Sequence, residues 1–142
     1  MSRAPILLLV VLPFLPQACN APQPSPDLLT PTESQIRLRS FQSKVIELRD
    51  RKRVMRGVIS VLQDLGFIIE RANEPLGLVT AARFAEPNFN DLVAVTVTVR
   101  QHEGRHLLVR ANAVFNNRPV EDPETYQRFF AALERSLFID RP

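Results

Sequence analysis

The sequence predicts a two-layer α+β domain in which two helices pack on one face of an antiparallel sheet of about five strands. Three observations support this prediction: an amphipathic segment between Asp50 and Phe67, two strictly alternating runs over residues 92–100 and 107–115, and a second amphipathic segment from Asp122 onward. A helix with one apolar stripe needs another layer to cover that stripe, and a sheet with one apolar face provides it. The expected order of elements is β-α-β-β-β-β-α.

The first predicted helix has a signal at each end. Asp50 can accept hydrogen bonds from the first-turn amides, and Gly66 suits the left-handed position after the last turn, where Phe67 can fold back. Gly57 borders the apolar stripe and is expected to let the helix approach a strand closely. The stripe recurs at spacings of three and four residues and consists of Val54, Val58, Ile59, Val61, Leu62 and Leu65.

The predicted strands follow from alternation and from turn residues. The segment 35–42 alternates and is expected to be the first strand, whereas 44–48 fits a continuing strand or an entry into the helix. The runs 67–71 and 78–84 flank Pro75 and Gly77, which predict a hairpin turn. The segment 86–91 is expected to be the next turn. The runs 92–100 and 107–115 are expected to pair through the short link 102–105. The expected apolar face of the first run is formed by residues 93, 95, 97 and 99, and the expected inward face of the second by residues 107, 109, 111, 113 and 115.

A second helix is predicted to open at Asp122. Asp122 suits the N-cap, Pro123 the first helical position and Glu124 the first turn. Its apolar stripe is expected to be buried and consists of Tyr126, Phe129, Phe130, Leu133 and Leu137. The predicted helix therefore adds three aromatic rings to the core.

The first eighteen residues differ from the rest of the chain. Arg3 is the only charge there, and the segment Ile6–Leu15 is almost wholly aliphatic but is interrupted by Pro13. Such a run is too short for a bilayer span of about 20 residues and fits a secretory signal peptide. We therefore divide the chain into a signal peptide (1–18), a lipidated cysteine with a proline-rich tether (19–34) and one α+β periplasmic domain (35–142).

The single cysteine of the chain, Cys19, lies where this segment would be cut. Residues 15–19, Leu-Pro-Gln-Ala-Cys, resemble the bacterial lipobox, although Pro16 stands where leucine is usual. The resemblance implies that Cys19 becomes the lipid-modified first residue. The alternative is an ordinary signal peptide cut near Ala21, which would leave a soluble periplasmic domain without an anchor. Asn20 is not the aspartate of inner-membrane retention, so an outer-membrane location facing the periplasm is expected, in a Gram-negative bacterium.

The residues around His102 match the H-E-x-x-H pattern of zinc metallopeptidases. That chemistry needs a helix, because only there do His102 and His106 face the same way with Glu103 directed at the metal-bound water. Here the motif falls between two strands and has Gly104 at its centre, so a surface turn is expected and no metal site is assigned. A zinc metallopeptidase is kept as the alternative function.

A basic cluster is the candidate surface for a membrane or a partner. We use this name for Arg49, Arg51, Lys52, Arg53 and Arg56. Cations at a helix N-terminus oppose the helix dipole, and anionic head groups or an acidic partner would offset that cost. The competing interpretation is an ordinary solvated helix face.

No other motif predicts chemistry. The sequence has no glycine-rich phosphate loop, both histidines lie in one turn, and the only thiol is assigned to lipid. We therefore assign no catalytic residue and no cofactor. Without Arg3, the chain from Cys19 onward has 17 basic and 15 acidic side chains, and its net charge of +2 is too near balance to favour nucleic acid.

Several motifs resemble a family of small, uncharacterised lipoproteins of Gram-negative bacteria. They are the segments 36–41, 61–67, 76–81, 122–130 and 136–138. The order of elements is also similar to the helix-grip domains of the C lipoprotein of the outer-membrane barrel-assembly machine, which is a likeness of fold alone. The resemblance implies an address and a shape, and no reaction.

The expected function is a lipid-anchored, non-enzymatic binding or accessory module of the cell envelope. Its expected contacts are the membrane, through the lipid on Cys19, and another envelope protein. Nucleic acid is not an expected partner, and the sequence leaves the oligomeric state open.

Overall fold

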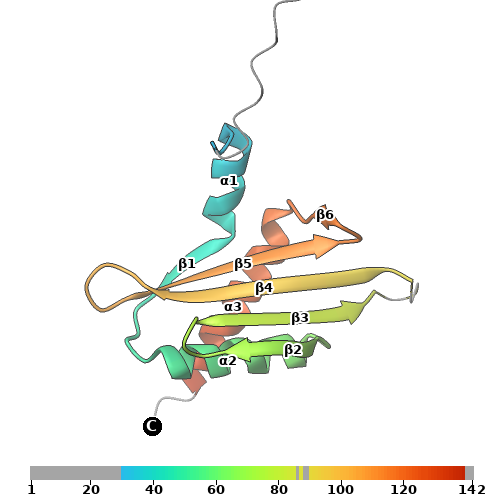
Figure 1. Ribbon diagram of the computed structural model, residues 1–142. Coiled ribbons are helices and arrows are strands. Elements are labelled where there is room, and N and C mark those ends of the chain that lie inside the picture. Colours follow the sequence, from blue (N-terminus) through green and yellow to red (C-terminus); the bar gives the residue numbers. More distant parts are fainter. Residues whose placement is uncertain (1–29, 86, 88–89, 140–142) are drawn as a thin grey trace, which may run out of the picture. The chain divides into compact units, whose positions relative to one another are not determined.

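The computed structural model describes residues 30–85, 87 and 90–139, which form three helices and one six-stranded antiparallel sheet (Figure 1). Its helices and strands are, in chain order, α1 (Glu33–Phe41), β1 (Ser43–Ile46), α2 (Arg51–Asp64), β2 (Ile68–Asn73), β3 (Leu78–Phe84), β4 (Leu92–Gln101), β5 (Leu107–Phe115), β6 (Arg118–Pro119) and α3 (Pro123–Ile139). The strands lie in the order β1-β5-β4-β3-β2, and β6 pairs with β5. The predicted two-layer α+β architecture is confirmed, with α2 and α3 behind the sheet.

The core lies between the sheet and helices α2 and α3. The inward residues of β4 and β5 that alternate in the sequence are buried, as predicted for 95, 97, 99, 107, 109, 111 and 113. The α3 stripe is buried in full, from Tyr126 to Leu137. In α2 the prediction holds for Val54, Val58, Val61 and Leu62, but Leu65 is exposed because it is already the C-cap residue. Phe115, predicted to point inward, is also exposed because it lies at the end of β5.

The ends of α2 and α3 have the predicted caps. The Asp50 carboxylate accepts a hydrogen bond from the Arg53 amide at 3.1 Å. At the other end of α2, the Gly66 amide donates to Gln63 O and the Phe67 amide to Leu62 O, the two bonds of a Schellman motif. Asp122 accepts from the amide and hydroxyl of Thr125, and these bonds hold the pKa of Asp122 below its ordinary value.

The prediction of a first strand over 35–42 is wrong, because this segment forms α1. Thr32 and Gln35 make a capping box: the Gln35 amide donates to Thr32 Oγ1 at 3.3 Å, and the Thr32 amide donates to Gln35 Oε1 at 3.0 Å. Leu38 and Phe41, three residues apart, pack against the core from one side of this helix. The first strand is β1, which overlaps the segment 44–48, for which the sequence allows either a strand or the entry into a helix. The observed order of elements therefore begins α-β-α.

The end of the sheet beyond β5 also differs from the prediction. Asn116 and Asn117 both have positive φ, 46° and 63°, and form a two-residue turn that returns the chain as β6. Asparagine tolerates this left-handed conformation better than most residues, which explains why a turn forms here. The predicted hairpins at 73–77 and 102–105 are confirmed, whereas the predicted turn at 86–91 lies partly outside the described residues.

A buried polar junction joins α1, β5, β6 and α3. The Tyr126 hydroxyl donates to Val120 O at 2.6 Å and accepts from the Ala113 amide and from Gln42 Nε2. Gln42, only 6% exposed, is the C-cap of α1. Along the edge of β5, this junction lies between the residues that pair with β1 and those that pair with β6. It therefore bonds the C-terminal end of α1 to the sheet.

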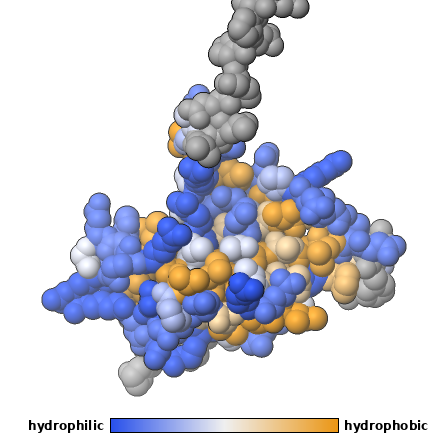
Figure 2. Space-filling view, in the orientation of Figure 1, coloured by the Kyte–Doolittle hydropathy of each residue, from blue (hydrophilic) through white to orange (hydrophobic). Residues whose placement is uncertain are grey.

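The outer face of the sheet, seen in Figure 2, is divided into an apolar and a polar part. One row across four strands joins Ile68, Ala82, Ala94 and Val114, and the neighbouring pair is Phe84 and Leu92. Apolar side chains gather at this end of the sheet, where β3 ends and β4 begins. The other rows carry threonine, asparagine and arginine, together with Leu78 and Leu108.

Candidate functional site

The structure separates the basic cluster into two groups. Arg49, Lys52 and Arg56 are exposed, whereas Arg51 and Arg53 are half-buried. Arg53 Nη2 donates to Leu137 O near the C-terminal end of α3 at 3.0 Å, where a cation is favoured by the helix dipole. Lys52 forms an exposed ion pair with Glu74 at 3.7 Å. The candidate surface is therefore Arg49, Lys52 and Arg56, while Arg53 has a structural role.

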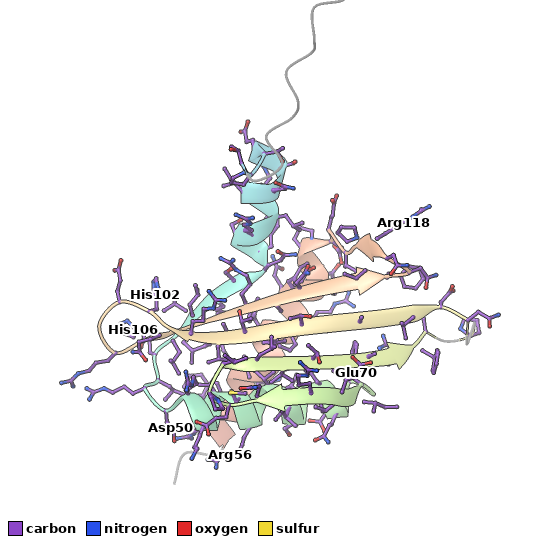
Figure 3. The ribbon with its side chains drawn as sticks, viewed as in Figure 1. Asp50, Arg56, Glu70, His102, His106 and Arg118 are labelled. Atoms are coloured by element: carbon purple, nitrogen blue, oxygen red, sulfur yellow. The ribbon has the colours of Figure 1, made fainter. Side chains whose placement is uncertain are left out.

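The H-E-x-x-H residues lie in a surface turn, as predicted. Figure 3 shows His102 and His106 at the tip of the β4–β5 hairpin, opposite the end that carries Arg118. The His102 amide donates to His106 O at 3.0 Å, and Gly104 has φ +64°. Among the residues that the structure describes, no group of three histidine, cysteine, aspartate or glutamate side chains could hold a metal ion. This backbone does not provide the helical spacing on which the metallopeptidase chemistry depends.

Cys19 and the tether lie outside the described residues, so the structure gives no geometry for the proposed lipid site. Within the described part of the chain, no helix has the length and apolar character of a membrane span.

An apolar cleft of about 600 Å³ lies beside α3. We call it the arginine-lined cleft. Its lining residues come from the end of α2, from the inner face of β3, β4 and β5, from the segment before α3 and from α3: Leu62, Leu65, Phe67, Arg83, Val93, Val95, Ala111, Ala113, Val120, Thr125, Tyr126, Arg128, Phe129, Ala131, Ala132 and Arg135. The cleft has the predominantly apolar lining and the few polar groups that are typical of small-molecule sites.

Arg83 is the polar group within the cleft wall. Its side chain is on the inward face of β3, the same face as the buried apolar side chains of Val79 and Ala81. Its guanidinium carbon lies 5.1 Å from the centroid of the Phe67 ring, a cation–π contact. Arg83 Nε is buried and has no hydrogen-bond partner among the described residues. A buried donor without a partner is costly, so this nitrogen is available to an acceptor from a ligand or from water.

Two further arginines from one side of α3 line the cleft. Arg128 is hydrogen-bonded to Glu124, which raises the pKa of Arg128 and offsets its charge. Arg135, two turns further along the helix, makes no ion pair within the described part of the chain. The cleft is thus apolar inside and carries an excess of positive charge.

Gly57 lies on α2 where this helix packs against α3. A β-carbon there would lie 2.9 Å from Leu137 Cδ2 and 3.3 Å from Leu133 Cδ1, so Gly57 allows a close approach of α2 to α3. The prediction that Gly57 faces a strand is wrong, because α3 covers this face of α2. A groove of about 610 Å³ runs along the same helix pair, past Ser60 and Ser136, and shares Leu65, Ala132 and Arg135 with the cleft.

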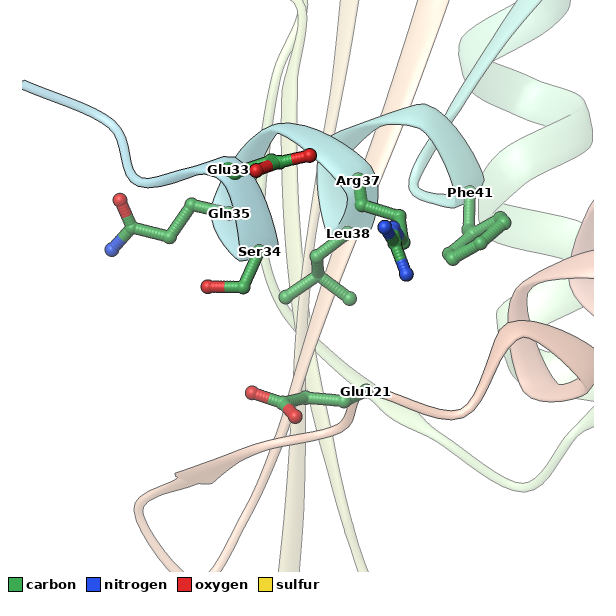
Figure 4. Close-up of a pocket in the computed structure, with 7 residues that line it drawn as sticks. All are labelled: Glu33, Ser34, Gln35, Arg37, Leu38, Phe41 and Glu121. Atoms are coloured by element: carbon green, nitrogen blue, oxygen red, sulfur yellow. The ribbon is translucent and has the colours of Figure 1, made fainter.

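A smaller hollow of about 410 Å³ lies under α1 (Figure 4). Arg37, Leu38 and Phe41 project from α1 toward the loop that carries Glu121. Glu33 and Glu121 give this hollow an acidic rim, which Arg37 partly balances. It lacks the buried, unpartnered donor that distinguishes the arginine-lined cleft.

The arginine-lined cleft was not predicted from the sequence. Arg83 falls within a run that is otherwise mostly apolar, although its position two residues after Ala81 places it on the inward face of β3. Arg128 and Arg135 are seven residues apart, a spacing that places them on one helix face beside the predicted stripe. These two signals were present, but nothing in the sequence indicated that the three residues meet.

No protein-family model matches this chain, and no curated protein matches it. The likeness to small Gram-negative lipoproteins therefore stays a prediction. Among solved structures, the chain is similar to one in the crystal structure of the adenylate sensor from AMP-activated protein kinase in complex with 5-aminoimidazole-4-carboxamide 1-beta-D-ribofuranotide, with 9% identity and a TM-score of 0.48. The match covers 67% of this chain and 94% of the other. At this level the likeness carries no argument about function.

Proposed function

We propose that this chain is a lipid-anchored, non-enzymatic binding module of the cell envelope, and that the arginine-lined cleft is its binding site. The observation that supports the proposal is the buried, unpartnered Arg83 Nε in the wall of a largely apolar cleft. Such a combination of apolar surface with one convergent polar group suits recognition of a ligand. No described constellation pairs a nucleophile with a base, so binding is favoured over catalysis.

The address of the module rests on Cys19 and the proline-rich tether. Twelve residues, Asn20 to Pro31, separate the cysteine from Thr32, the N-cap of α1. At about 3.1 Å per residue, a fully extended tether of this length reaches roughly 37 Å. The domain would thus remain within reach of the outer membrane and of another envelope protein.

Replacing Cys19 with serine is expected to abolish the incorporation of labelled palmitate, because serine has no thiol for lipid attachment. The experiment labels growing cells that make the full chain, and it compares Cys19→Ser with Ser25→Ala in the same stretch. We expect the label and the outer-membrane location to be lost in Cys19→Ser alone. If Cys19→Ser still carries the label, or the wild-type chain never does, the chain is not anchored through Cys19.

The exposed part of the basic cluster is proposed to contact anionic lipid. Each cation near such a surface contributes about 1 kcal/mol of attraction. In the full chain carrying Cys19→Ser, changing Arg49, Lys52 and Arg56 together to glutamine is therefore expected to weaken binding to anionic vesicles about a hundredfold at low salt. Thermal stability should hardly change, because the three side chains are exposed and the Lys52–Glu74 pair is a surface ion pair.

The matched control removes three exposed arginines elsewhere in the domain. The triple change of Arg39, Arg71 and Arg118 to glutamine alters the net charge equally. Vesicle flotation at low and high salt separates a local contact from a general charge effect. Equal losses in the two triple variants would show that net charge alone governs the binding and that this surface is an ordinary solvated face.

A further inference from the structure

We propose that the arginine-lined cleft binds the anion of a single long-chain fatty acid, with its carboxylate at Arg83 and its chain along the apolar wall. This inference rests on the proposed function, since it names the ligand class of the same site. Its evidence is the chemistry of Arg83, the character of the wall, the volume of the cleft and the charge around it.

Arg83 has the properties of a carboxylate receptor. Its guanidinium is fixed on one side by the Phe67 ring, and its Nε faces no acceptor among the described residues. A guanidinium can give two parallel N–H···O bonds to a carboxylate, and the carboxylate would supply the acceptor that Nε lacks. Because Arg83 forms no described ion pair, no resident carboxylate has to be displaced.

The wall suits an acyl chain. Most of the remaining wall is aliphatic or aromatic, with Leu62 and Leu65 from the end of α2, Val93 and Val95 from β4, and Phe129 from α3. Small side chains at positions 111, 113, 131 and 132 leave the space open. An acyl chain gains affinity by removing apolar surface from water, and this wall offers no buried hydrogen-bonding group that it would leave unpaired.

The volume of the cleft is compatible with an acyl chain. At about 600 Å³ it lies within the range of about 300–1,000 Å³ that is typical of small-molecule sites. The single guanidinium of Arg83 can pair with one carboxylate, so one fatty acid is expected in the cleft.

Charge also favours an anion over a neutral amphiphile. Glu124 offsets the charge of Arg128, but Arg83 and Arg135 carry charges that no described side chain balances. Positive charge along a cleft with apolar walls raises the local concentration of anions. The carboxylate form should therefore bind more tightly than an uncharged molecule of the same length.

The test compares palmitate with hexadecanol, which has the same chain length and no charge. The protein is the full chain with Cys19→Ser, purified without detergent, and calorimetry gives affinity and stoichiometry. Tyr126 is the only tyrosine, the chain has no tryptophan, and Tyr126 lines the cleft, so tyrosine emission reports binding there. We expect one palmitate per chain, bound at least tenfold more tightly than hexadecanol.

Variants assign the carboxylate to Arg83. Arg83→Gln should weaken the binding of palmitate at least tenfold and leave the binding of hexadecanol unchanged. Arg83→Lys, which keeps a charge, should lose less of the affinity for palmitate. Arg100→Gln, on the exposed outer face of β4, is the matched control and should change neither affinity. Ala132→Phe, which fills the cleft, should weaken the binding of both ligands. Gln127→Phe, at an exposed position of α3 that does not line the cleft, should weaken the binding of neither. Circular dichroism verifies that each variant is folded.

Absence of palmitate binding, or equal affinities of wild type for palmitate and hexadecanol, would overturn the proposal even if the Arg83 variants failed to fold. A palmitate affinity that Arg83→Gln leaves unchanged would also overturn it. The broader proposal has its own readout, because a photo-crosslinker placed at position 132 captures whatever occupies the cleft in cells. Crosslinks there without palmitate binding would refute the ligand assignment and retain the binding module. The absence of both crosslinks and palmitate binding would refute both the ligand assignment and the binding site.

Discussion

Replacing Gly77 with alanine is expected to be the most destabilising single change in the β2–β3 hairpin, at about 3–5 kcal/mol. Gly77 has φ +62°, a conformation that costs a residue with a β-carbon about 1–2 kcal/mol. A β-carbon there would lie only 2.1 Å from Val99 O, a backbone atom of the neighbouring segment. The turn would have to move, and the bond from the Val99 amide to Gly77 O, 2.7 Å long, would be lost.

Gly104 provides a matched control for this prediction. It has a similar positive φ, +64°, but no atom lies within 4 Å of the position of its β-carbon. Gly104→Ala should therefore show the conformational cost alone, about 1–2 kcal/mol. Urea unfolding followed by circular dichroism measures both variants. If Gly77→Ala loses no more stability than Gly104→Ala, the close approach between the turn and β4 does not contribute to stability.

Gly77 also bears on the basic cluster. A β-carbon at position 77 would lie 3.6 Å from Arg51 Cδ, so the half-buried Arg51 packs beside this turn. Arg53, on the same helix, reaches the last described turns of α3. Two of the five cations thus help to hold α2 against its neighbours. This division explains why the experiment on lipid binding changes only Arg49, Lys52 and Arg56.

The helix ends could be predicted because their signals are local. Asp50, Gly66 and Asp122 act within three residues of their own positions, so the sequence contains the whole interaction. The alternating runs of β4 and β5 were predicted for a similar reason, since a period of two identifies the buried face directly. These features together determined the two-layer architecture.

The error at α1 arose from a pattern that fits two structures. Over eight residues, Ile36, Leu38 and Arg37 alternate as a strand would, while Leu38 and Phe41 have helical spacing. The Thr32–Gln35 capping box settles the choice in favour of helix, and the sequence already contained that signal. The exposed face of α1, with Ile36 56% exposed, shows that alternation here did not mark a buried face.

The cleft and the partner of Gly57 could not be predicted, because they depend on contacts between distant segments. Gly57 meets Leu133 and Leu137 only because α3 returns beside α2. Arg53 reaches the Leu137 carbonyl across 84 residues of chain. Arg83 was visible as a charge on an inward strand position, but its position over the Phe67 ring depends on how α2 ends beneath β3.

A photo-crosslinker in place of Ala132 is expected to capture a ligand in living cells, whereas the same group in place of Gln127 is expected to capture none. Ala132 lines the cleft, whereas Gln127, on the same helix, is exposed and is not among the residues that line it. The expected contrast is close to all or none, because ligand access to the cleft side alone decides whether an adduct forms.

The mass of the captured species measures the central claim, that the arginine-lined cleft is the binding site of this module. Cells that make the full chain with benzoylphenylalanine at position 132 or 127 are irradiated, and the intact protein is analysed by mass spectrometry. Our account predicts an adduct of fatty-acid mass at position 132, reduced when Arg83→Gln is combined with it, and none at position 127. No adduct at position 132, or equal capture at both positions, would contradict it.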